Sequence, residues 1–196
     1  VEGYSEFLWA VLLGGVEKLG LEITFWARLL TIVGSLGLLF HMLAFGADKL
    51  GLGRAGLVAA GLFLGTNPTV GVWTTGGLSS SLFALSIFLC FRALFDDPSK
   101  PRGWSAGFWG TATCLFRADG PFWIVVLLFV ALVAQLLARR SVQSPERSAA
   151  VFFPAFLRAC LVLIAAGAIF IAWRINTYGD YLPNTARAKV GMTALS

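Results

Sequence analysis

Long apolar runs separated by short polar connectors make up most of the chain. Six of these runs reach or approach the roughly 20 residues that a helix needs to cross a bilayer core. They are 26–47, 56–73, 77–95, 104–116, 121–138 and 151–173. Residues 5–20 are also apolar, but glycines interrupt them and Glu6, Glu17 and Lys18 bound them, which favours a helix lying in the membrane interface. The pattern predicts an all-α, polytopic membrane protein with about six transmembrane helices and an N-terminal interfacial helix.

The runs follow one another without a polar segment long enough to fold separately. We therefore expect a single transmembrane domain over 1–196. Within it, 1–22 correspond to the interfacial helix, 26–176 to the six spans and 177–196 to an outer loop. The short run at 104–116 is followed by Arg117 and Asp119, which places polar groups at the membrane edge.

Composition supports a membrane protein over the other classes. The chain is 58% hydrophobic, 13% charged and has a mean hydropathy of +0.81. These values exclude a disordered tail and most soluble domains. The net charge of +5 does not indicate nucleic-acid binding, because the cations lie in connectors and form no basic stripe with aromatic residues between them. Cys90, Cys114 and Cys160 lie in apolar runs without paired spacing, so we interpret them as small apolar fillers.

Connector charges predict the orientation. Eight cations occupy the connectors 48–55, 92–103 and 139–150, whereas the connectors 74–76 and 117–120 contain only Arg117. The eight are Lys49, Arg54, Arg92, Lys100, Arg102, Arg139, Arg140 and Arg147. Because cytoplasmic loops carry the excess of Lys and Arg, the first set of connectors is expected to be cytoplasmic. Both termini then face outward.

Four stretches on the predicted outer face combine polar or charged residues with Gly, Pro, Tyr or Asn. They are 1–4, 73–80, 116–121 and 178–189. Charged side chains at membrane depth are costly and tend to be functional. We therefore expect a site assembled from separate loops at this face.

Each stretch also has a structural interpretation. Asp119 could cap the helix that begins near Pro121, and Arg117 could pair with it or extend to lipid head groups. Arg187 and Lys189 could bind anionic lipid. Serines 79–81 could cap the start of a helix.

The single histidine, His41, lies within an apolar run and is expected to be a hydrogen-bonded core group, so we propose no metal site. Gly61 and Gly65 could allow a close helix contact or simply be tolerated in lipid.

Taken together, the motifs resemble those of bacterial GT-C glycosyltransferases, in particular the terminal arabinofuranosyltransferases of cell-wall polymers. V-E-G-Y-S-x-F-L-W at 1–9 is similar to the end of their first outer loop. G-G-L-S-S-S-L-F at 76–83 resembles their G-G-L-E-T-A-L-F, and F-R-A-D-G at 116–120 resembles their T-R-P-D-G. Y-G-D-Y-L-P-N-T-A-R-A-K at 178–189 resembles their Y-G-D-x-L-P-N-T-x-Y-A-K and is the most specific match. The resemblance covers essentially the whole chain.

Two positions depart from the family pattern. The acidic residue of the second motif is Ser79 here, and the aromatic residue before the final Ala-Lys is Arg187. The key aspartate of such families lies in the first outer loop, which would precede Val1. By this resemblance the chain is expected to be the middle of an enzyme, with the general base upstream and the piece alone inactive.

The resemblance implies transfer of a sugar such as arabinofuranose from a polyprenyl-phosphate donor to a cell-envelope glycan or lipid acceptor. The reaction would take place on the extracytoplasmic face of the cell membrane. Arg117, Arg187 and Lys189 would bind the donor phosphate. Asp119 and Asp180 would be the catalytic-site carboxylates, contacting sugar hydroxyls or orienting other groups, and Glu2, Tyr4 and Asn184 would contribute to substrate binding. No cofactor is evident, and the need for a divalent ion stays open.

Two other function classes compete with a transferase. A transporter or flippase also uses interrupted helices, and residues 66–69 (T-N-P-T) would interrupt the second span. A non-catalytic assembly subunit of the cell envelope is the other alternative, since Ser79 replaces an acidic residue and the first outer loop is missing.

Overall fold

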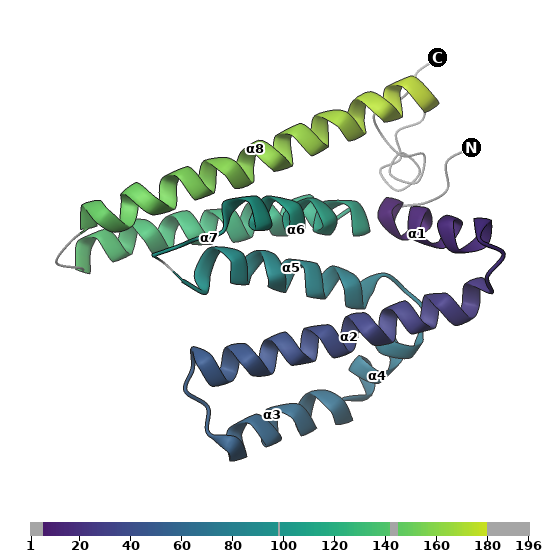
Figure 1. Ribbon diagram of the computed structural model, residues 1–196, viewed down its shortest axis with the longest axis horizontal. Coiled ribbons are helices and arrows are strands. Elements are labelled where there is room, and N and C mark those ends of the chain that lie inside the picture. The colour runs from purple at the N-terminus through teal and green to yellow at the C-terminus, as the bar shows by residue number, and fades with distance from the viewer. Residues whose placement is uncertain (1–5, 98, 142–144, 180–196) are drawn as a thin grey trace, which may run out of the picture.

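The computed structural model describes residues 6–97, 99–141 and 145–179, with side chains described outside 138–150. Every regular element of these residues is an α-helix (Figure 1). The helices are α1 (Phe7–Lys18), α2 (Ile23–Asp48), α3 (Arg54–Thr66), α4 (Pro68–Thr75), α5 (Ser80–Phe95), α6 (Gly103–Phe116), α7 (Gly120–Ser141) and α8 (Pro145–Tyr178). The predicted all-α class is confirmed.

Three helical segments are long and apolar enough to cross a membrane. They are Ile23–Asp48, Gly120–Leu137 and Val151–Tyr178. Helices α3 and α4 qualify together as a fourth span, although they are bent by 62°. Helices α5 and α6 contain 16 and 14 residues, fewer than the roughly 20 of a full crossing. The described residues therefore contain three or four candidate spans.

The bend between α3 and α4 falls at Asn67. Its side-chain Oδ1 accepts a hydrogen bond from the backbone N–H of Thr69 at 2.9 Å, and Pro68 is the first residue of α4. An Asn cap followed by Pro begins a new helix, and the residue before Pro is driven out of the helical conformation. The prediction that residues 66–69 interrupt the second apolar run is confirmed.

Apart from the bent pair α3–α4, successive helices run in opposite directions, so the connections between them gather at two ends of the molecule (Figure 1). One end, the basic end, holds the connections 49–53 and 96–102, in which Lys49, Lys100 and Arg102 lie. The other, the site end, holds helix α1, the start of α5 and the connection 117–119. This grouping agrees with the two sets of connectors expected from the hydropathy pattern.

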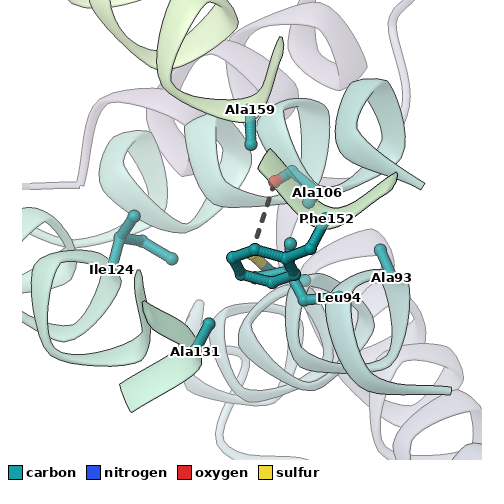
Figure 2. Close-up of a cluster of buried hydrophobic side chains, with 8 residues drawn as sticks. Ala93, Leu94, Ala106, Ile124, Ala131, Phe152 and Ala159 are labelled. Carbon is teal, nitrogen blue, oxygen red and sulfur yellow. Dashed lines mark hydrogen bonds between the residues drawn. The ribbon is translucent and has the colours of Figure 1, made fainter. Parts of the chain in front are cut away.

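The main core lies where α5, α6, α7 and α8 meet (Figure 2). It consists of Cys90, Ala93, Leu94, Ala106, Ile124, Ala131, Phe152 and Ala159. Four of these are alanines, and small side chains let helix backbones approach closely in a membrane. Cys90 is buried there, and its Sγ donates a hydrogen bond to the carbonyl oxygen of Ala106 at 3.3 Å.

Glycines bring α6 and α8 into the closest contact. A Cβ atom added at Gly103 would lie 2.1 Å from the carbonyl oxygen of Ala155, and one at Gly107 would lie 2.6 Å from Cβ of Val162. The pair considered in the sequence, Gly61 and Gly65, makes no such contact. A Cβ at Gly61 would meet Leu43 at 3.9 Å, and one at Gly65 would meet nothing within 4 Å.

Large apolar side chains cover the outside of the bundle. Phe40, Phe63 and Ile169 are 68%, 71% and 71% exposed, and neither α3 nor α4 buries any residue. Such a surface is suited to lipid rather than to water. Together with the long apolar helices, it supports a membrane protein.

Candidate functional site

Of the residues predicted to form the site, the structure describes Arg117 and Asp119. The others lie outside the described residues. They are Glu2, Tyr4, Asp180, Asn184, Arg187 and Lys189.

Arg117 and Asp119 occupy the short connection between α6 and α7. Helix α6 ends at Phe116, Arg117 has extended backbone angles, and α7 begins at Gly120. Arg117 Nε donates to Asp119 Oδ1 at 2.9 Å, and Arg117 Nη2 lies 3.5 Å from Asp119 Oδ2. The side chains thus form an ion pair at the site end, which was one of the interpretations left open by the sequence.

This ion pair keeps both side chains charged. The hydrogen bond from Arg117 lowers the pKa of the Asp119 carboxyl below its ordinary value. The same bond raises the pKa of Arg117, and the negative charge of Glu6 adds to that effect. Glu6 therefore lies close enough to act on Arg117, which brings the start of α1 to the site.

Packing holds the connection against α5 and α1. The guanidinium carbon of Arg117 lies 5.3 Å from the ring centroid of Phe83, within range of a cation–π interaction. Beside it, a second buried cluster of Trp9, Ala27 and Phe116 joins α1, α2 and α6, and Phe83 packs against this cluster. The site end is therefore a packed junction of four helices.

An apolar cavity of about 650 Å³ lies between α2, α3, α4 and α5, and Arg117 is part of its lining. Most of the wall is apolar, including Leu39, Met42 and Leu64. Arg117 lies at the site end of the cavity, because it belongs to the connection 117–119. The volume of the cavity falls in the range of small-molecule sites.

A chain of hydroxyl groups crosses the cavity wall. Thr74 Oγ1 donates to Ser35 Oγ at 2.9 Å, Ser35 Oγ donates to Ser81 Oγ at 2.8 Å, and Ser81 Oγ donates to the carbonyl oxygen of Trp73 at 3.4 Å. Thr31 Oγ1 also donates to the carbonyl oxygen of Thr74 at 2.8 Å. These hydrogen bonds connect α4 to α2 and α5, and the sequence pattern did not predict them.

The serines at 79–81 do not cap α5 as one interpretation of the sequence expected. Ser79 precedes the helix but makes no side-chain capping bond, and Ser81 bonds across to α2 and α4. The Ser79 hydroxyl is fully buried and has no hydrogen-bond partner among the described residues.

Arg174 is a site-end cation that the sequence reasoning missed. It is 3% exposed in α8, and its guanidinium carbon lies 5.7 Å and 5.9 Å from the ring centroids of Phe170 and Tyr178. Phe7 of α1 packs against Phe170 and Trp173 with ring centroids 4.9 Å and 5.0 Å apart. The sequence feature that could have indicated this residue is a charged side chain near the end of the last apolar run.

A second polar cluster lies toward the basic end. Arg92 Nη1 and His41 Nδ1 are 2.9 Å apart, and Arg92 also forms an ion pair with Asp96 at 2.8 Å. His41 is hydrogen-bonded, as expected, but its side chain is only partly buried, so it is not a core group. Among the described residues, no three side chains of His, Cys, Asp or Glu lie close enough together to hold a metal ion.

The fold and the site together define an all-helical membrane protein with a charged junction at the end of an apolar cavity. Comparisons of the chain with known protein families, with curated proteins and with solved structures find no significant match.

Proposed function

We propose that the chain belongs to a GT-C type glycosyltransferase that moves a sugar from a polyprenyl-phosphate donor to a cell-envelope glycan or lipid. One observation carries this proposal beyond the motifs: an apolar cavity between the helices has the Arg117 guanidinium at its site end. The apolar wall suits an isoprenoid chain, and Arg binds phosphate with two parallel hydrogen bonds. A sugar such as arabinofuranose would lie beyond Arg117, outside the hydrocarbon layer.

In this proposal the chain crosses the membrane six times. Helices α2, α7 and α8 each cross once, the bent pair α3–α4 counts as one span, and the shorter α5 and α6 complete the set. Helix α1 lies in the interface, and the basic end faces the cytoplasm. The site end then faces the extracytoplasmic side of the cell membrane.

The proposed roles follow the chemistry of glycosyl transfer. Arg117, with Arg187 and Lys189, would stabilise the leaving phosphate, because negative charge develops on it in the transition state. Asp119 and Asp180 would act on sugar hydroxyls or orient other groups, and Glu2, Tyr4 and Asn184 would help bind the substrate. The general base is proposed to lie in an outer loop upstream of Val1, where it would take the acceptor proton.

The test is sugar transfer by the full-length protein in vesicles, with a radiolabelled farnesyl-phosphate arabinofuranose donor. Arg117→Ala should reduce product formation at least roughly tenfold, because charge-assisted hydrogen bonds contribute about 1.5–3 kcal/mol. Arg54→Ala is the matched control, because Arg54 is exposed, carries the same charge as Arg117 and does not line the cavity. Glu22→Gln, which neutralises an exposed carboxylate that caps α2, is a second control. Equal activity of Arg117→Ala and Arg54→Ala would contradict the proposal.

A transporter is the second candidate, and the 62° bend at Asn67 favours it. Interrupted helices supply substrate sites in many transporters. Asn67→Ala should then abolish substrate flux across vesicles, whereas a transferase should keep its product formation within about twofold because Asn67 does not line the cavity.

A further inference from the structure

Two neighbours outside the cavity wall hold Arg117 in position. Arg117 lines the cavity, whereas Asp119 and Phe83 are not among the described residues that do. The Asp119 carboxylate binds Nε and Nη2 of Arg117, and the Phe83 ring lies over its guanidinium. Because Asp119 engages Nε and Nη2, the N–H groups of Nη1 are left for a ligand.

Asp119 is itself held from a second side. Trp123, one turn into α7, has its indole Nε1 3.4 Å from Asp119 Oδ2. Both carboxylate oxygens are therefore engaged, and the pKa of Asp119 lies below its ordinary value. A carboxylate in this state is a weak acceptor for a substrate proton.

We propose that Asp119 is a positioning residue, which fixes the Arg117 guanidinium so that it binds the phosphate of a lipid phosphate lying in the cavity. This inference rests on the proposed function, in which Arg117 binds the donor phosphate. It gives Asp119 a role in phosphate binding, exerted through Arg117, and no direct contact with the sugar. The Phe83 ring serves as the platform under the guanidinium.

The two roles for Asp119 make opposite predictions for a ligand without sugar. A positioning residue affects the binding of farnesyl phosphate and leaves the uncharged farnesol unaffected. A residue that contacts the sugar directly affects neither ligand. Farnesol therefore also reports whether a variant keeps the cavity intact.

The experiment measures binding of both ligands to the full-length protein in nanodiscs of phosphatidylcholine. Asp119→Asn should weaken farnesyl phosphate binding about tenfold, in the range that loss of an orienting group costs. Asp119→Glu should recover part of the loss, and farnesol affinity should stay constant. The double variant Arg117→Ala with Asp119→Asn should bind farnesyl phosphate no more weakly than Arg117→Ala alone, since Asp119 acts only through Arg117. Glu22→Gln should match the parent chain.

Three results would overturn the inference. Unchanged farnesyl phosphate binding in Asp119→Asn, additive losses in the double variant, or equal loss of farnesol binding would each show that Asp119 does not act through Arg117. If Arg117→Ala still lowers farnesyl phosphate affinity in these cases, the proposed function stands without the positioning role. If Arg117→Ala binds farnesyl phosphate like the parent chain, the phosphate role of Arg117 fails, and the proposed function with it.

Discussion

At the scale of single residues, the site depends on one ion pair that is only partly shielded from solvent. The side chains of Arg117 and Asp119 are 36% and 47% exposed. An exposed pair contributes about 0.2–1 kcal/mol to stability. Its value to the protein is therefore geometric, because it fixes where the guanidinium points, more than energetic.

The pH dependence of stability should reveal this pair. Asp119 has a lowered pKa in the folded protein, so its contribution is present above the unfolded-state pKa and is lost as the pH falls through the folded-state value. Thermal unfolding in detergent between pH 6 and pH 3 should show a smaller acid-induced loss in Asp119→Asn than in the parent chain, by less than about 1 kcal/mol. Identical acid slopes would mean that the pair contributes nothing to folding.

His41 offers a second test at this scale. Because Arg92 donates to its Nδ1, His41 carries its own proton on Nε2 and links α2 to α5. His41→Ala should lower the free energy of unfolding by about 1.5–3 kcal/mol, the value of a hydrogen bond to a charged group. Val33→Ala, which shortens a 57% exposed side chain on the same helix, is the control in a thermal unfolding assay. Equal stability of the two variants would contradict the structural role of His41.

The sequence could predict the Arg117–Asp119 pair because the two residues are neighbours in the chain. It could not predict Phe83 beneath Arg117, or the burial of Arg174, because both depend on how distant helices pack. The hydroxyl bonds from Ser35 to Thr74 and Ser81 join residues 39 and 46 positions apart. Hydropathy carries no information on which face of a helix meets which partner.

At the scale of elements, hydropathy predicted the helix ends closely everywhere except in α8. The predicted run 26–47 corresponds to Ile23–Asp48, and 104–116 corresponds to Gly103–Phe116. Helix α8 begins at Pro145, six residues before the apolar run at 151. Hydropathy detects only the part of a helix suited to lipid, whereas polar residues such as Glu and Arg also favour helix.

The glycine contact between α6 and α8 gives a prediction for this scale. Gly107→Ala would place its Cβ 2.6 Å from Cβ of Val162 and 3.1 Å from the carbonyl oxygen of Ala159, so the helices must separate. We expect a loss of about 1–3 kcal/mol in the free energy of unfolding, the usual cost of overpacking.

Gly65→Ala is the matched control for this variant. Its Cβ would meet nothing within 4 Å, so the same substitution should leave stability equal or slightly higher. Denaturant unfolding of both variants in the same detergent makes the comparison. Similar losses in the two would show that packing against α8 does not decide the outcome.

At the scale of the whole molecule, the alternating direction of the helices separates charge between two ends. The connections at the basic end hold Lys49, Lys100 and Arg102, whereas the connection 117–119 at the site end holds Arg117. The connector parity made this separation predictable. The cavity was not, because its wall is assembled from α2, α3, α4 and α5, a consequence of packing over long sequence distances.

Cysteine labelling in intact cells tests how this charge separation is oriented. Ser99, in the connection at the basic end, and Ala118, between Arg117 and Asp119, are both exposed. Since the end richer in Lys and Arg stays in the cytoplasm, Ala118→Cys should react with a membrane-impermeant maleimide from outside, and Ser99→Cys only after permeabilisation. The parent chain, with its three native cysteines, gives the background. The reverse pattern would place Arg117 in the cytoplasm, where an extracytoplasmic transfer reaction could not use it. Labelling of both positions from outside would rule out the crossing of α6, which lies between them.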